Sequence, residues 1–187
     1  MKKRLLIPLF ILIAALSAEA QQVSLQTNVL DWLALGTVNM EAGLAVSQHF
    51  SLFAGGRYNP WSFETDNPKA QLLNQQQTAY IGARYWTWYV NSGLWFAIKG
   101  QYQNYVNTGL WRAALKEGRN GWGGGLSFGY SHMLSKHINL EAGVGAWIVH
   151  YGAYNYYDSP RKMTARHEGP ATLVYPDFVS LSIVYVF

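Results

Sequence analysis

The chain has 187 residues, of which 50% are apolar, 16% aromatic and 13% charged. Soluble domains carry about 25% charged residues, so charge is scarce, yet a mean hydropathy of −0.05 excludes a bundle of membrane helices. The sequence also lacks the run of about 18 apolar residues that a membrane-spanning helix needs. The 8 Trp, 13 Tyr and 8 Phe residues exclude intrinsic disorder.

The N-terminus has the pattern of a secretory signal peptide. A short basic start precedes the apolar run Leu5–Leu16, and Ala18 and Ala20 occupy the small-residue positions of a cleavage site. We therefore expect residues 1–20 to be removed and residues 21–187 to form one domain.

The predicted leader changes the charge of the chain. It holds three of the 14 basic residues and one of the 10 acidic residues, so the net charge falls from +4 to about +2. The pI of 9.2 therefore gives no support to nucleic-acid binding. Cysteine is absent, which excludes disulfides, a lipid-modified cysteine and a thiolate metal site.

The rest of the chain alternates with the period of two that is typical of strands. Apolar residues occupy every second position in segments 38–46, 50–58 and 179–187. No comparable amphipathic helix follows residue 21. The pattern predicts eight strands, at about residues 22–30, 37–47, 50–59, 78–88, 93–104, 122–133, 137–151 and 177–187.

The predicted connections alternate in length. Short ones fall at residues 47–49, 88–93 and 134–137, and the longer polar ones fall at residues 31–36, 60–77, 105–121 and 152–176. This predicts an all-β fold: an eight-stranded antiparallel up-and-down transmembrane β-barrel of the Gram-negative outer membrane, with both termini on the periplasmic side. A soluble, lipocalin-like periplasmic binder is the alternative architecture.

Charged residues recur on one face of the predicted strands, where they favour a polar lumen over an apolar core. They are Glu41, Arg57, Arg84, Lys99 and Glu141. We expect them to form an ion-pair network, with partners such as Tyr80 and Gln101, that plugs the lumen and fixes strand register. A small-ion gate is the alternative role. Glycines on the same face should make room for Tyr80, Trp95 and Trp147, because eight strands enclose an interior just wide enough for side chains.

Aromatic residues gather at the predicted strand ends, as in the two interfacial belts of membrane barrels. The periplasmic belt would contain Phe50, Tyr85, Trp88, Tyr89, Tyr185 and Phe187, and the outer belt would contain Tyr58, Trp61, Tyr102, Trp122 and Tyr175.

The C-terminal strand resembles the recognition signal of outer-membrane barrels, a terminal aromatic residue preceded by apolar residues at alternate positions. The matching residues are Leu181, Ile183, Tyr185 and Phe187. The resemblance implies that the barrel assembly machinery is a folding partner.

A wider resemblance covers nearly all of the predicted mature chain. The segments that carry it are Arg57–Phe63, Ala83–Trp86, Gly129–Lys136 and Asn139–Ala142. They are similar to a domain-of-unknown-function family of small outer-membrane barrels from anaerobic Gram-negative bacteria. The resemblance implies location and fold, and it implies no activity.

Catalytic residues are not predicted. Ser131 and His132 are adjacent and should face opposite sides of a strand. The Ser135–His137 and His49–Ser51 pairs lie at predicted turns without an acidic partner, His150 has no serine on its face, and His167 lies in the last loop. A serine hydrolase needs a serine, a histidine and an acid together. No metal or cofactor motif is present either, so no metal or cofactor is expected.

These observations predict a non-enzymatic outer-membrane barrel, a monomer surrounded by lipid, with a structural or surface-interaction role. The last two long loops are mildly basic and rich in aromatic residues. We expect them to be solvated connections, with surface recognition of an unidentified ligand or partner as the alternative. A lipid-modifying enzyme and a narrow passive channel are the alternatives.

Overall fold

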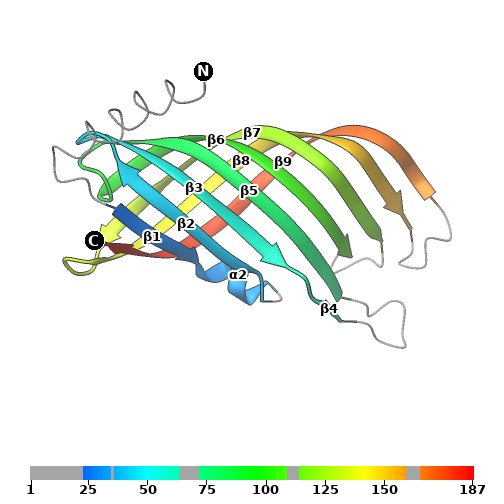
Figure 1. Cartoon of the computed structure of the whole chain (residues 1–187), viewed down its shortest axis with the longest axis horizontal. Coiled ribbons are helices and arrows are strands. Elements are labelled where there is room, and N and C mark those ends of the chain that lie inside the picture. Colours follow the sequence, from blue (N-terminus) through cyan, green and yellow to red (C-terminus); the bar gives the residue numbers. More distant parts are fainter. Residues whose placement is uncertain (1–22, 35, 64–71, 109–113, 159–164) are drawn as a thin grey trace, which may run out of the picture.

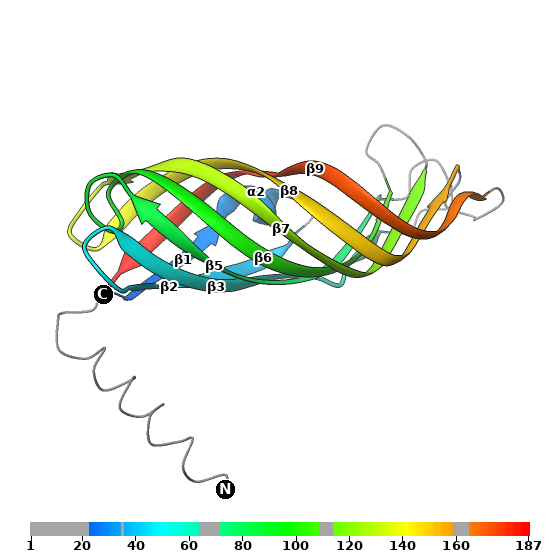
Figure 2. The ribbon, with the colours of Figure 1, turned by 90° about the horizontal axis from the view of Figure 1, so that it is seen from above.

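The computed structural model describes residues 23–34, 36–63, 72–108, 114–158 and 165–187. Eight antiparallel strands form a closed barrel (Figures 1 and 2). They are β1 Val23–Asn28, β2 Val38–Ala45, β3 Phe50–Asn59, β5 Leu72–Trp86, β6 Gly93–Thr108, β7 Leu115–Met133, β8 Ile138–Tyr157 and β9 Ala165–Val186. The two-residue strand β4, Ser62–Phe63, pairs with β5 outside the ring. The predicted leader, with Ala18 and Ala20, lies outside the described residues.

Barrel closure joins the first strand to the last. Neighbouring strands follow chain order, β3 pairs with β5, and β1 pairs with β9 from Ser24 opposite Val186 to Asn28 opposite Ser182. The amide of Phe187 also donates to the carbonyl of Val23 at 2.9 Å. The predicted eight-stranded up-and-down barrel is confirmed, and the C-terminus lies at the end that carries the short turns (Figure 1).

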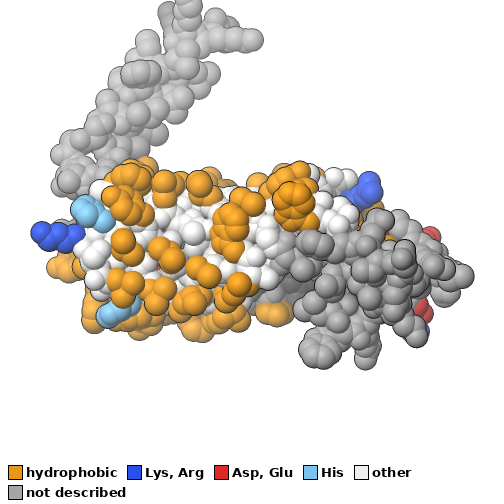
Figure 3. Space-filling view, turned by 90° about the horizontal axis from the view of Figure 1, so that it is seen from below, with side chains coloured by type: hydrophobic (Ala, Val, Ile, Leu, Met, Phe, Trp, Pro, Cys, Tyr) orange, Lys and Arg blue, Asp and Glu red, His pale blue; other side chains and the backbone are white. Residues whose placement is uncertain are grey.

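The two faces of the wall differ in polarity. In β6, Trp95, Ala97 and Lys99 are buried, whereas Phe96 and Ile98 between them are exposed. Large apolar side chains on seven of the eight strands have 50% to 68% of their surface exposed: Met40, Leu52, Ile81, Ile98, Leu126, Ile148 and Val179. Apolar side chains therefore cover the outside of the barrel, and charged ones appear at its ends (Figure 3).

Five strands are longer than predicted at the end opposite the short turns, which we call the long-loop end. β5 begins at Leu72, β6 extends to Thr108, and β7 begins at Leu115. β8 and β9 extend in the same direction, to Tyr157 and from Ala165. These extensions lack apolar alternation, so the sequence indicated loops. Their backbones nevertheless pair, and β5 to β9 project beyond β1 to β3 (Figure 1).

A short helix corrects the predicted first strand and its connection. β1 ends at Asn28, and α2, Val29–Leu33, follows it. The Asn28 side chain caps the helix by accepting from the amide of Leu30 at 3.2 Å. It also accepts from the amide of Leu181 at 3.0 Å, which attaches the start of the helix to β9. No helix among the described residues is long and apolar enough to cross a membrane.

Side chains fill the barrel interior. Trp86 and Trp95 pack with Phe53 in one cluster, and Trp147 packs with Val149 and Tyr151 in another. Inward-facing glycines make the space for these rings. A Cβ at Gly129 or Gly143 would lie within 3 Å of the Trp95 ring, and one at Gly125 would meet Trp147, Cβ to Cβ, at 2.5 Å.

Candidate functional site

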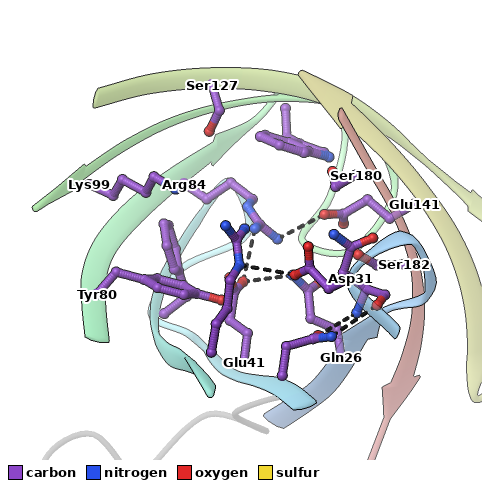
Figure 4. A pocket seen from close by; sticks show the side chains of 15 residues that line it. Gln26, Asp31, Glu41, Tyr80, Arg84, Lys99, Ser127, Glu141, Ser180 and Ser182 are labelled. Carbon is purple, nitrogen blue, oxygen red and sulfur yellow. Dashed lines mark hydrogen bonds and ion pairs between the residues drawn. The ribbon is translucent and has the colours of Figure 1, made fainter. Parts of the chain in front are cut away.

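The lumen holds an ion-pair cluster centred on Arg84 of β5 (Figure 4). Its guanidinium donates through Nη2 to Oε1 of Glu41 on β2 at 2.9 Å, and its Nη1 lies 3.3 Å from Oε1 of Glu141 on β8. All three residues are less than 10% exposed. One cation therefore joins two carboxylates from separate parts of the wall.

Further groups complete the shell around this cluster. The Gln26 amide donates to Oε1 of Glu41 at 2.9 Å. The Arg84 guanidinium also lies over the Trp95 ring, 4.5 Å from its centroid. The ring of Tyr80 lies 5.1 Å from Nζ of Lys99 and 5.9 Å from Cζ of Arg57. Cation–π contacts of this kind gain strength where water is excluded.

Arg57 has a partner that the sequence did not indicate. Its Nε atom lies 3.0 Å from Oδ2 of Asp31 in α2, and both side chains are at most 15% exposed. Asp31 belonged to a predicted outer connection, so nothing in the period-two pattern placed it in the lumen. The only available signal was an acidic residue close to the end of a short strand.

The five lumen charges predicted from the sequence all line one cavity. They and Asp31 border a cavity of about 30 Å³. Glu41, Arg84 and Glu141 meet directly, Arg57 pairs with Asp31, and Lys99 faces Tyr80. Gln101 was expected as a partner, but its amide donates to Gln103 at 3.5 Å instead.

Charge in this cluster is balanced, because three acidic side chains face three basic ones. Unpaired charges in a tight interior are costly, so a narrow lumen requires that its charges balance. A cavity of about 30 Å³ has room for about one water molecule. The acidic and basic side chains stabilise one another's charges, and together they fill this part of the barrel interior.

Two short turns share one construction that the sequence reading missed. Each begins Ser-x-His, at Ser47 and at Ser135, and each serine hydroxyl accepts from the amide of the residue after the histidine. Nδ1 of His49 contacts the carbonyl of Trp86 at 3.1 Å, and Nδ1 of His137 contacts that of Val186 at 2.9 Å. Each histidine therefore attaches its turn to the end of the neighbouring strand. The repeated Ser-x-His motif is the sequence signal from which this construction could have been predicted.

The remaining serines and histidines do not join an acid in one group among the described residues. Ser131 lies opposite Glu141 on β8, but the neighbouring His132 faces the other side of the strand. Ser131 is buried and donates to the carbonyl of Asn91 at 3.2 Å, whereas His132 is exposed on the opposite face. Nδ1 of His150 lies 2.9 Å from the hydroxyl of Thr172 on the exposed wall. Within the described ranges, no group of three or more His, Asp or Glu side chains is arranged to hold a metal ion.

The predicted C-terminal signal and aromatic belts lie mostly on the outer wall. Ile183, Tyr185 and Phe187 are 49%, 45% and 64% exposed. Tyr102 is partly buried against the Trp122 ring, with centroids 4.7 Å apart. The side chain of Tyr175 lies outside the described residues. The exposed belt residues are Phe50, Tyr58, Trp61, Tyr85, Trp88, Tyr89, Trp122, Tyr185 and Phe187.

An exposed ion pair lies at the far tips of β8 and β9. Nε of Arg166 donates to Oδ2 of Asp158 at 2.7 Å. This hydrogen bond raises the pKa of Arg166 above its ordinary value. Because the side chains are 65% and 38% exposed, the pair contributes little to stability.

Comparison with known proteins identifies a family for this chain. No curated protein is similar to the chain. The model of a family described as "Protein of unknown function (DUF3575)" matches residues 6–187. The match spans nearly the whole chain, so the chain belongs to this DUF3575 family of proteins of unknown function.

Proposed function

We propose that this protein is a non-enzymatic β-barrel of the Gram-negative outer membrane whose lumen is closed and whose long-loop end faces outward as an interaction surface. The observation that carries the proposal is the inverted polarity of the wall. Ile81, Ile98 and Leu126 are more than 60% exposed, whereas Arg84, Lys99 and Glu141 are less than 8% exposed. Lipid is the solvent in which that arrangement is favourable.

The dimensions of the wall support insertion in a bilayer. On β3, the exposed rings of Phe50 and Tyr58 are eight positions apart. At about 3.3 Å per residue and a strand tilt of about 40°, this separation corresponds to a height of about 20 Å. The apolar band of membrane barrels is about 25 Å tall, so these rings are placed near its two borders.

The packing of side chains in the lumen favours a closed plug rather than a conducting pore. The cavity beside the Arg84 cluster measures about 30 Å³. The aromatic cluster of Phe53, Trp86 and Trp95 packs against Arg84, and the second aromatic cluster fills another part of the interior. We propose that the cluster holds the strands in register and blocks ion flow.

The C-terminal strand supports assembly by the barrel assembly machinery. The outward side chains of Ile183, Tyr185 and Phe187 leave this strand face available to a folding partner. Cleavage of the leader after Ala20 would complete export.

Heat-modifiable gel migration tests the membrane proposal. The detergent-extracted protein should migrate differently before and after boiling, and it should fractionate with the outer membrane. A protein that stays in the aqueous fraction and shows no shift would contradict the proposal.

Planar-bilayer conductance tests the closed lumen. The wild-type protein should give no steady current, and Glu41→Ala should lower the thermal unfolding temperature. If Glu41→Ala leaves stability unchanged and opens a current, the cluster is an ion gate and the plug proposal is wrong.

A further inference from the structure

A cleft lies at the long-loop end, between the end of β3 and strands β5, β6 and β7. Its volume is about 590 Å³, within the range of about 300–1,000 Å³ that is typical of small-molecule sites. It is separate from the ion-pair cluster, with which it shares no lining residue.

Uncharged polar groups dominate the lining. Six amide side chains border the cleft, and the two tyrosines Tyr58 and Tyr105 join them. Arg119 is the one charged lining residue, and the lining includes no carboxylate. The amides belong to Asn59, Gln75, Gln76, Gln77, Asn104 and Asn120.

Several of these groups have free hydrogen-bonding capacity. Tyr58, Gln77 and Asn104 are successive cross-strand neighbours, so they form a row across β3, β5 and β6. Tyr58, Gln77 and Arg119 are exposed. Among the described residues, no side chain contacts the amide of Gln77 or the guanidinium of Arg119 within hydrogen-bonding or ion-pair distance.

A β-bulge fixes the geometry at one side of the cleft. Arg119 and Asn120 together face the single residue Asn104, and Asn120 has a φ of 52°. Oδ1 of Asn104 accepts from the Asn120 amide at 2.7 Å, and its Nδ2 donates to the Tyr102 hydroxyl at 3.0 Å. That hydroxyl donates to Oδ1 of Asn120 at 3.2 Å, which closes a ring of bonds. Bulges often redirect side chains beside functional sites, and this one fixes the backbone that carries Arg119.

We propose that this cleft binds a saccharide that carries an anionic group. The exposed amide of Gln77 offers donors and an acceptor, the combination that sugar hydroxyls require. The amides of Asn59, Gln75, Gln76 and Asn104 already make hydrogen bonds within the protein. The exposed ring of Tyr58 offers an apolar face to a sugar ring. The fork of donors on Arg119 suits a phosphate or carboxylate substituent. A single cation is too little for a polyanion such as nucleic acid, whose binding rests on several phosphate contacts.

The position of the cleft relative to the membrane rests on the proposed function. That position allows two sources for such a ligand. Tyr58 belongs to the outer aromatic belt, so the cleft adjoins the level of lipid headgroups. A saccharide can therefore arrive as the headgroup of a membrane glycolipid or as a soluble oligosaccharide.

Binding measurements on the full mature chain in phosphatidylcholine nanodiscs test the proposal. One arm titrates the deacylated oligosaccharide of lipopolysaccharide by calorimetry. A second arm places intact lipopolysaccharide in the nanodisc and records NMR shifts of the Gln and Asn side-chain amides. Inorganic phosphate alone is the third probe.

Three variants report on the cleft. Arg119→Gln should weaken saccharide binding about tenfold, because it removes a charge-assisted contact. Gln77→Leu should weaken it several-fold. The matched control is Lys116→Gln, which removes a charge from an exposed residue of the same strand outside the lining and should leave binding unchanged.

Each result bears on the proposal. Binding of the free oligosaccharide supports a soluble ligand, and amide shifts with intact lipopolysaccharide alone support a headgroup. Phosphate that binds as tightly as the saccharide, or Lys116→Gln as damaging as Arg119→Gln, overturns the proposal. A barrel that inserts and shows the heat shift but binds no saccharide overturns this inference alone, whereas a barrel that fails to insert overturns the proposed function.

Discussion

Arg57 on β3 and Asp31 on α2 form an ion pair in which Nε and Oδ2 lie 3.0 Å apart. This pair matters because of where the helix lies. β1 ends at Asn28, and α2 follows it and packs against β2 and β9. The ion pair attaches this part of the wall to β3 through the lumen.

Replacing Asp31 should therefore loosen the helix. Asp31→Asn leaves the mostly buried Arg57 without its carboxylate, and we expect the free energy of unfolding to fall by about 1–3 kcal/mol. Urea unfolding in lipid vesicles, followed by tryptophan fluorescence, measures the loss. The control Asp158→Asn breaks the exposed pair with Arg166 and should leave the free energy of unfolding nearly unchanged. Equal losses would contradict a structural role for the Arg57–Asp31 pair.

Removing the central cation should cost more than removing it together with one of its carboxylates. Arg84→Met leaves Glu41 and Glu141 buried without their shared partner, and we expect a loss of about 3–5 kcal/mol. Adding Glu141→Gln should restore most of this stability, because Glu41 and Asp31 then balance Arg57 and Lys99 in the lumen. The same urea titration compares the single and double variants. A double variant less stable than Arg84→Met would mean that Glu141 acts independently of Arg84.

Two glycines in neighbouring strands should respond in opposite directions to the same change. A Cβ at Gly123 would collide with backbone atoms of Ile148 and Val149, whereas nothing lies within 4 Å of a Cβ at Gly100. Gly123→Ala should cost about 1–3 kcal/mol through overpacking. Gly100→Ala should gain about 0.5–1 kcal/mol, because the unfolded chain loses freedom. Thermal unfolding of both variants gives the comparison, and a stable Gly123→Ala protein would show that the strands can separate there.

A charge on the outer wall distinguishes a membrane barrel from a soluble one. Ile81 is 68% exposed, so Ile81→Lys would be harmless in water. In a bilayer, we expect a loss of about 2–4 kcal/mol if the site lies near the midplane. Gln48→Lys, in an exposed short turn, should have little effect in either setting. Unchanged stability of Ile81→Lys in vesicles would contradict the membrane proposal.

The sequence by itself determined the class of fold and the direction of each face. Alternation along segments such as Val38–Val46 has the geometry of a strand, and burial of Glu41 beside exposed Met40 follows directly from that period. The placement of Arg57, Arg84, Lys99 and Glu141 on the inner face followed from the same rule. The inverted polarity of the barrel wall could be predicted because charged and large apolar residues occupy alternate positions of the same strands.

Only the tertiary structure decided which charges meet. Arg84 pairs with Glu41 and Glu141, and Arg57 pairs with Asp31, because the stagger and tilt of the strands set the height of each side chain along the barrel. A period-two pattern in the sequence does not contain these heights. The Asn28 side chain caps the helix that carries Asp31, and the same side chain joins the helix to Leu181 of β9, a contact that depends on the closed ring. The cleft beside Arg119 likewise depends on a bulge and on polar strand extensions, which pair through backbone atoms and leave no apolar pattern to read.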